Sequence, residues 1–496
     1  MKQLLIGLVV VLCIMLFATD PYLTEENVNE FITELEDQGF IVQQGMLYSF
    51  DMPDLFSNYI TPSCYGNNAD TPYCVYFLPP APNQTVENSF PFTARMGKDE
   101  AIIFIGWTPP EVTYFSYETL IMFRHFPGED VPTRIFAGVG DTVNIMNIKT
   151  GESIKEETEG TVFNAPTIII STPDKNIDKM MRAAAKKVGF SQEIINTDVI
   201  PSPILKLGID KYCDELIFGS RFAFFKNPED KSYALDPSAL KDGKFWTKPP
   251  YSHNHRGWVL RVTPSNPVEL DPFPVPNLVP RDSGDYSELN LKPTMDKLEE
   301  AIIEYYSDFD AVSLRTRRWI ELSYIAIQNN TDVLGDSRDS IYFRTESFLL
   351  GKDTEDFAIV FGPIHALTGK AIYSSFVIYT DDLVQDLLPY ESNILYGFLS
   401  VNSEQTPESK LGLIGSAERF LPDNPNAKYF YVWKIARSNP DNEDYCVTIP
   451  SETPCERITY NNLMVAFRAY INPATGVGPS YEEILMDKVI HFKPNK

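Results

Sequence analysis

Short apolar segments rich in β-branched and aromatic residues recur along most of the chain, and they constrain the fold more than any other feature. Such side chains favour extended backbone, and Gly, Pro and Asn commonly bound the strands that they form. The segments concerned are residues 101–105, 113–117, 167–171, 357–361, 371–379, 429–433 and 463–467. We therefore predict an α+β fold that is dominated by β-strands, with sandwich-like sheets.

A few stretches carry helical periodicity instead. Thr24 is suited to cap a helix that ends near Gly39, because apolar residues follow it at helical spacing. A second amphipathic helix is predicted from Asp174 to about Val188, and another from Thr294 to about residue 307. We expect these helices to lie beside the sheets.

A proline-rich stretch divides the chain near its middle. Seven prolines fall within residues 264–293, and proline favours extended backbone that cannot donate to a sheet ladder. We interpret this stretch as the connection between a first α+β unit, residues 20–263, and a second, residues 294–496. A long strap that lies over one of the units is the alternative.

The two units share a hairpin-like pattern. Residues 99–104 and 114–120 form one pair of apolar segments around a proline-containing turn, and residues 356–361 and 372–378 form another. A duplicated β-sandwich half would produce this repetition. A chance resemblance between two apolar hairpins would produce it as well.

The N-terminus predicts export. Lys2 precedes an unbroken apolar run, residues 4–18, and acidic residues follow it. This arrangement is typical of a signal peptide or, if uncleaved, a signal anchor, which we assign to residues 1–19. The bulk of the chain is then secreted or extracytoplasmic, where the sequons at Asn83 and Asn329 would be glycosylated in a eukaryotic host.

The charge balance narrows the range of partners. The chain of 496 residues has 42 Lys and Arg against 68 Asp and Glu, so its formal net charge is −26. Phosphate contacts need clustered cations, so we expect no nucleic-acid partner. Anionic lipid is disfavoured for the same reason, which leaves membrane contact through the N-terminal segment alone.

Cysteine spacing agrees with an oxidising compartment. Cys64 and Cys74 flank one turn-rich loop, and Cys446 and Cys455 flank another. We predict a local disulfide within each pair. Zinc is the rival interpretation, but neither pair has the C-x-x-C spacing. Cys213 is left over, and a buried inert thiol is the expected state.

The histidines offer the best candidate for a metal site. His253 and His255 form a His-x-His pair, and side chains two apart on a strand share one face. We choose His365 over His125 as a third ligand, which would give a site for a divalent transition metal such as zinc. The alternative is a polar turn with imidazoles at the surface.

Two functions from different classes remain open. The first is an exported hydrolase-like enzyme, assisted by a metal at the histidines. The second is a non-catalytic exported binding or surface protein, whose ligand is a small molecule, a glycan or a protein. A pocket in which His253, His255 and another His or a carboxylate converge would favour the enzyme, whereas a broad apolar patch without converging polar groups would favour the binding protein.

Overall fold

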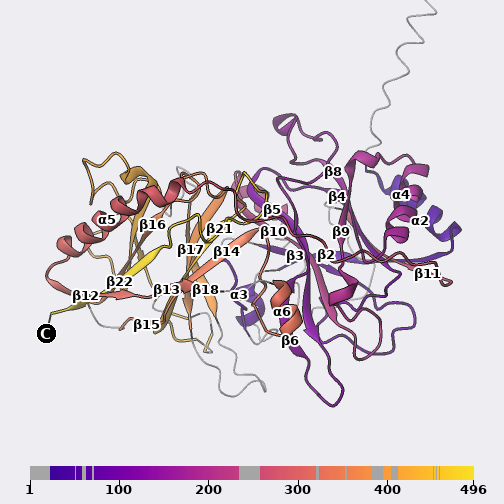
Figure 1. Cartoon of the computed structure of the whole chain (residues 1–496), viewed down its shortest axis with the longest axis horizontal. Coiled ribbons are helices and arrows are strands. Elements are labelled where there is room, and N and C mark those ends of the chain that lie inside the picture. The colour runs from indigo at the N-terminus through magenta and orange to yellow at the C-terminus, as the bar shows by residue number, and fades with distance from the viewer. Residues whose placement is uncertain are drawn as a thin grey trace, which may run out of the picture.

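The protein consists of four β-sheets arranged as two pairs, with some helices on the outer faces and others where the two pairs meet (Figure 1). This computed structural model describes residues 23–50, 52–57, 63–69, 72–233, 257–319, 323–351, 355–381, 395–403, 412–450, 452–453, 455–456 and 458–495. The predicted leader, residues 1–19, lies outside that range. The β-dominated α+β fold with two sandwich-like units is confirmed.

The first unit alternates strands with three helices. Its elements are α2 (Glu25–Asp37), β1 (Phe40–Gln44), β2 (Met46–Phe50), α3 (Met52–Ser57), β3 (Tyr73–Phe77), β4 (Ala101–Trp107), β5 (Val112–Arg124), β6 (Thr133–Gly138), β7 (Val143–Asn144), β8 (Pro166–Thr172), α4 (Lys175–Lys187), β9 (Ile195–Val199), β10 (Glu215–Phe225) and β11 (Gly257–Pro264).

The second unit begins with a helix and continues mainly with strands. Its elements are α5 (Lys292–Tyr305), β12 (Phe309–Leu314), β13 (Thr316–Arg318), α6 (Ser323–Asn329), β14 (Ser340–Thr345), β15 (Phe348–Leu349), β16 (Phe357–Pro363), β17 (Tyr373–Thr380), β18 (Tyr396–Asn402), β19 (Phe430–Ala436), β20 (Cys446–Thr448), β21 (Asn462–Tyr470) and β22 (Lys488–Pro494).

The two units have the same topology. The outer sheets run β1-β11-β4-β8-β9 and β12-β22-β16-β19-β20, and the inner sheets run β2-β3-β10-β5-β6 and β13-β14-β21-β17-β18. In both outer sheets the last pair alone is parallel, β8 with β9 and β19 with β20. The hairpins compared in the sequence, β4–β5 and β16–β17, occupy equivalent places. The duplicated half is therefore confirmed.

Local sequence explains where the helices lie. The Thr24 side chain caps α2 by accepting from the Asn27 backbone N–H at 3.2 Å, as predicted. Asp174 caps α4 in the same way. The third helix, α5, begins at Lys292 rather than Thr294, because a short helical turn over Ser287–Leu291 leads directly into it.

Each unit has three layers. Helices α2 and α4 cover the outer sheet of the first unit, and α5 covers that of the second. A second core fills the space between the outer and inner sheets of each unit. Because β16 is buried along its whole length and β4 along all but its last residue, their sequences are continuous apolar runs rather than alternating ones.

The inner sheets of the two units face each other. Tyr114 and Ala223 from β5 and β10 pack against Tyr373 and Tyr470 from β17 and β21. The rings of Tyr114 and Tyr470 lie 4.6 Å apart. The middle of the molecule is consequently built from residues of both halves of the sequence.

The units also exchange equivalent segments. The segment between β2 and β3 crosses to the second unit, where Phe56 is buried in the core between the sheets. The segment between β13 and β14 crosses the other way and buries Ile327 and Val333 in the core of the first. Figure 1 shows the result, with α3 beside β18 and α6 beside β6. Neither sandwich core is complete without the other half of the chain.

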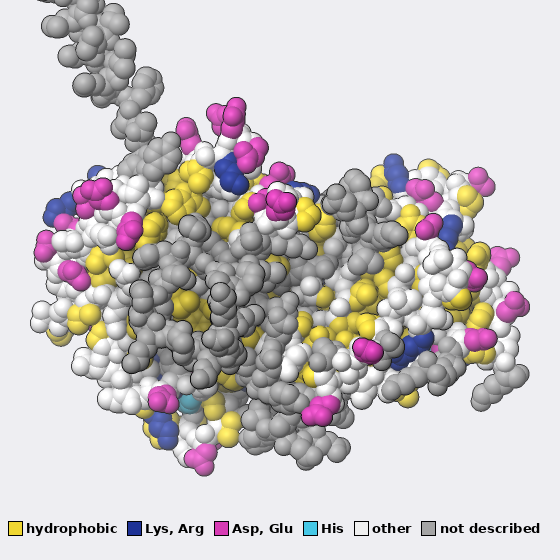
Figure 2. Space-filling model, turned by 180° about the vertical axis from the view of Figure 1, so that it is seen from behind, with side chains coloured by type: hydrophobic (Ala, Val, Ile, Leu, Met, Phe, Trp, Pro, Cys, Tyr) yellow, Lys and Arg dark blue, Asp and Glu magenta, His cyan; other side chains and the backbone are white. Residues whose placement is uncertain are grey.

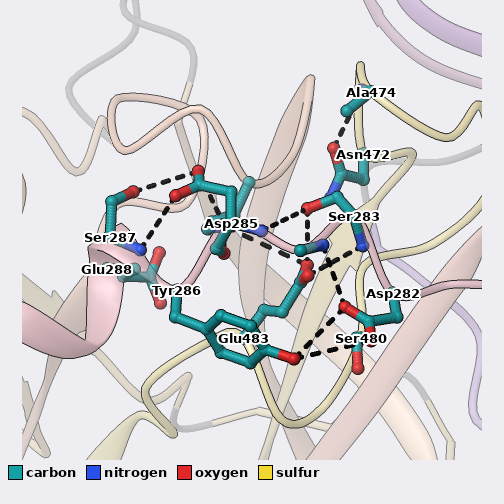
Figure 3. A network of polar contacts seen from close by, with 12 residues as sticks. Asp282, Ser283, Asp285, Tyr286, Ser287, Glu288, Asn472, Ala474, Ser480 and Glu483 are labelled. Carbon is teal, nitrogen blue, oxygen red and sulfur yellow. Dashed lines mark hydrogen bonds and ion pairs between the residues drawn. The ribbon is translucent and has the colours of Figure 1, made fainter.

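The proline-rich stretch makes hydrogen bonds to both units. At its start, the Asp271 backbone N–H donates to Asp174 at 2.6 Å. Near its end, the backbone N–H and the hydroxyl of Ser283 donate to the carboxylate of Glu483 at 2.7 and 2.8 Å (Figure 3). The stretch is thus held by hydrogen bonds to both units.

The surface reflects the acidic composition. Figure 2 shows Asp and Glu side chains spread over both ends of one face, with Lys and Arg in small groups among them. No helix in the described part of the chain is long and apolar enough to cross a lipid bilayer.

Candidate functional site

A cavity of about 120 Å³ lies where the exchanged segments meet the inner sheet of the first unit. For scale, an apolar cavity of roughly 150 Å³ holds a benzene molecule. Most of the wall is apolar and comes from strands β3, β5, β6 and β10 and from the second unit; it includes Val75, Leu120, Met122, Phe136, Ile217 and Leu334. The polar groups in this wall are few and come mainly from β5, β10 and β21.

Strand β5 places a row of polar side chains on the face toward the second unit. Tyr114, Ser116 and Glu118 share this face because side chains on a strand alternate. Arg221 of β10 lies directly opposite Ser116 in the sheet register. These four residues form the polar side of the inner sheet.

Arg221 connects the two units through charge. Its guanidinium bonds the carboxylate of Asp339, which also accepts from the Tyr114 hydroxyl at 2.6 Å. Asp339 is fully buried. Burial acts to raise its pKa, but the charge of Arg221 and the hydrogen bonds outweigh burial and lower it. Asp339 therefore remains an anion that neutralises Arg221.

Glu118 is the second carboxylate beside Arg221, and it lines the cavity. Its Oε1 lies 2.9 Å from Nε of Arg221. The side chain is 8% exposed, and its Oε2 is buried without a hydrogen-bond partner. Burial raises the pKa of Glu118 to about 7, against the opposite effect of Arg221. A carboxyl of this kind can accept or donate a proton near neutral pH.

Arg468 of β21 is the structural counterpart of Arg221. Arg221 lies opposite Ser116 and Tyr73, while Arg468 lies opposite Ser375 and Tyr342. Arg468 also lines the cavity and is 5% exposed.

The partners of Arg468 differ from those of Arg221. Its Nη2 donates to the Gly66 carbonyl, and Nη1 has no hydrogen-bond partner. The rings of Tyr342 and Tyr379 lie 5.7 and 5.9 Å from its guanidinium carbon. No carboxylate in the described ranges forms an ion pair with Arg468.

A sequence repeat marks this site, although the predictions made from the sequence did not include it. Residues 66–73, GNNADTPY, and residues 335–342, GDSRDSIY, share the pattern G-x-x-x-D-x-x-Y. The sheet register places Tyr73 and Tyr342 at equivalent positions. Asp339 belongs to the second copy, and Asp70, its counterpart in the sequence, lies outside the described residues. Aligning these two octapeptides would have pointed to the centre of the molecule.

Unfavourable backbone geometry recurs at equivalent positions of the two units. Positive φ in a residue other than Gly is uncommon and costs about 1–3 kcal/mol. The pairs concerned are Tyr65 (51°) with Leu334 (53°), Phe136 (39°) with Leu395 (43°), and Phe224 (59°) with Ile471 (46°). Tyr65, Phe136 and Leu334 line the cavity. Such strain, maintained by the surrounding fold, is typical of functional sites.

The predicted metal site is described only in part. His253 and His255 lie outside the described residues. His365 is buried, with Nδ1 3.0 Å from Glu288 and Nε2 3.6 Å from Asp487. Burial opposes its protonation, but these two carboxylates outweigh burial and raise the pKa of His365 to about 10. Because an imidazolium has no lone pair for a metal, His365 acts as a buried cation here.

The metal and glycosylation hypotheses otherwise stay predictions. Within the described ranges, no three potential ligands of the His, Cys, Asp or Glu type gather into a metal-binding group. The sequon residues Asn83 and Asn329 are both exposed.

The two disulfides also stay predictions. In the described part of the chain, Cys446 and Cys455 are not joined to each other. Cys64 and Cys74 both line the cavity, and the Cys74 sulfur lies 3.1 Å from the Ser49 hydroxyl. Cys446 is half-buried, and burial raises its pKa to about 11. Cys213 is half-buried too, and burial likewise raises its pKa.

Comparison with known proteins assigns no family to the chain. No family model matches the chain. No curated protein sequence matches it either. The chain is similar to the crystal structure of an uncharacterized protein from Burkholderia cenocepacia, with a TM-score of 0.38 and 10% identity over 97% of this chain and 92% of the other.

Proposed function

We propose that this protein binds a small organic molecule in the cavity between its two units. The observation that carries the proposal is that two residues lining the cavity each have a buried polar atom with no hydrogen-bond partner, Oε2 of Glu118 and Nη1 of Arg468. Leaving such atoms unpaired costs about 1–3 kcal/mol each, and more when the group is charged. A ligand that pairs with them recovers this free energy.

The surroundings of these atoms favour binding of a small molecule. Binding sites are typically apolar concave spaces with a few convergent polar groups, and they occur preferentially between domains. The cavity fits this description. The charge of the chain, −26, and the predicted export support a function outside the cytosol that does not involve nucleic acid.

A variant that copies the second unit tests the proposal. Tyr379 stands at the position equivalent to Leu120, because each lies opposite a glycine, Gly397 or Gly138, of the next strand. The Tyr379 hydroxyl donates to the Asn67 carbonyl at 2.5 Å. Leu120→Tyr should therefore fill the cavity with a side chain that the same fold already accommodates.

Binding is followed through methionine methyl groups. Met52 and Met122 line the cavity, whereas Met146 is exposed elsewhere. With isobutanol as an uncharged probe, we expect the methyl NMR signals of Met52 and Met122 to shift in the wild type but not in Leu120→Tyr. The Met146 signal should stay unchanged in both proteins.

Leu349→Tyr is the matched control, since Leu349 is exposed on β15. This variant should bind isobutanol like the wild type. Equal shifts at Met52 and Met122 in a folded Leu120→Tyr protein would contradict the proposal. So would a wild type that responds to no small organic probe.

A further inference from the structure

We infer that the ligand is a small apolar carboxylic acid that also carries a hydrogen-bond donor, such as an α-hydroxy or α-amino acid. This inference rests on the proposed function and specifies the chemistry of its ligand. The carboxylate would pair with Arg468, and the donor would meet Oε2 of Glu118.

The charged partners of the two arginines differ although their positions are equivalent. Arg221 is paired with Asp339 and also contacts Glu118. Arg468 has only the Gly66 carbonyl and neighbouring tyrosines around it in the described part of the chain. An unpaired buried cation is costly in protein interiors. A carboxylate is the planar anion that a guanidinium binds best, through two parallel hydrogen bonds.

Glu118 selects for a donor in the same cavity. Above its pKa of about 7, Glu118 is an ionised carboxylate that accepts hydrogen bonds only, and its Oε2 has no hydrogen-bond partner. A hydroxyl or an ammonium of the ligand would supply it. An amine without a carboxylate would leave Arg468 unpaired, and a simple acid would leave Glu118 unpaired.

The volume of the cavity and its apolar lining limit the size of the ligand's aliphatic group. A cavity of about 120 Å³ admits a branched aliphatic group, and Leu120, Met122 and Ile217 offer it an apolar surface. Suitable probes are valine, α-hydroxyisovalerate, isovalerate and isobutylamine, because they share one aliphatic body and differ only in their polar groups.

The test measures the dissociation constant of each probe from the Met52 and Met122 methyl shifts of the full chain. We expect valine or α-hydroxyisovalerate to bind most tightly, isovalerate more weakly and isobutylamine weakest. Tighter binding of valine would indicate an amino acid as the ligand class, and tighter binding of α-hydroxyisovalerate would indicate a hydroxy acid.

Substitutions then assign the polar contacts. Arg468→Gln should weaken binding of all three acids by about tenfold or more, the scale of a charged hydrogen bond, and leave isobutanol binding unchanged. Arg468→Lys should restore part of the affinity, because it restores the charge. Glu118→Gln should reduce the advantage of the two donor-bearing acids over isovalerate, because a neutral amide oxygen is a weaker acceptor than a carboxylate. Arg182→Gln, which alters the Asp178 ion pair on α4, is the control and should change none of these values.

The outcomes separate this inference from the proposed function. If isobutanol binds but the acids gain nothing from Arg468 in a folded protein, the inference is wrong and the cavity is still a binding site. If neither isobutanol nor any acid shifts the two methyl signals, both are wrong. A cooperative thermal unfolding transition like that of the wild type, together with an unchanged Met146 signal, establishes that each variant is folded.

Discussion

Glu118 makes the stability of the protein depend on pH in an unusual direction for a carboxyl. Its pKa of about 7 lies above the ordinary value of 4.5, so the folded state binds the proton more tightly than the unfolded state. The free energy of unfolding should therefore fall as pH rises from about 4.5 to 7, by on the order of 2–4 kcal/mol.

Glu118→Gln keeps the shape of the side chain and removes its titration. Urea denaturation of both proteins at a series of pH values measures the effect. The wild type should lose stability relative to the variant as pH rises through this window. Parallel pH profiles for the two proteins would contradict the assignment.

The charged His365 side chain contributes to the stability of the folded state, and this contribution is lost only at alkaline pH. Its pKa of about 10 in the folded state exceeds the ordinary 6.5, so the contribution is fully present below about pH 6.5 and disappears as pH rises through about 10. Breaking such a buried ion pair costs about 3–5 kcal/mol. We expect His365→Gln to unfold at lower urea concentration near pH 6, and the difference from wild type to shrink near pH 10. A difference that stays constant with pH would argue against a charged His365.

At the scale of elements, α6 shows how a helix of one unit stabilises the other. Ile327 is fully buried in the core of the first unit, whereas Ile325, two residues away, is 46% exposed. Ile327→Ala should lower the free energy of unfolding by about 2–5 kcal/mol. Ile325→Ala, the control on the same helix, should change it little.

The loss of stability should appear in the first unit. Hydrogen exchange should accelerate in β5 and β10 of the first unit in the Ile327→Ala protein, although the substitution lies in the second half of the sequence. Faster exchange confined to β14 and β21 would show that α6 supports its own unit instead.

Across the whole molecule, the sequence predicted what local patterns encode. The cap at Thr24, the strand over residues 101–105 and the paired hairpins all follow from neighbouring residues, and they were found. The candidate site could not be found in this way. Glu118 looks like one position of an alternating strand, and nothing near it indicates that Arg221 and Asp339 converge on it.

The centre of the molecule depends on contacts between distant segments. Arg221 and Asp339 are separated by 118 positions, and local periodicity carries no information on such a pairing. The repeated octapeptides at 66–73 and 335–342 were the one signal within reach, because two copies of a pattern at equivalent strands indicate a shared structural role.

The exchanged segments also determine when the protein can finish folding during synthesis. Ile327 and Val333 complete the core of the first unit, so about two thirds of the chain must leave the ribosome before that core can close. Domains generally fold in order of synthesis, but here the N-terminal one waits for its neighbour. The predicted export would require an unfolded chain during passage through the membrane, and we expect a first unit that cannot close early to favour that state.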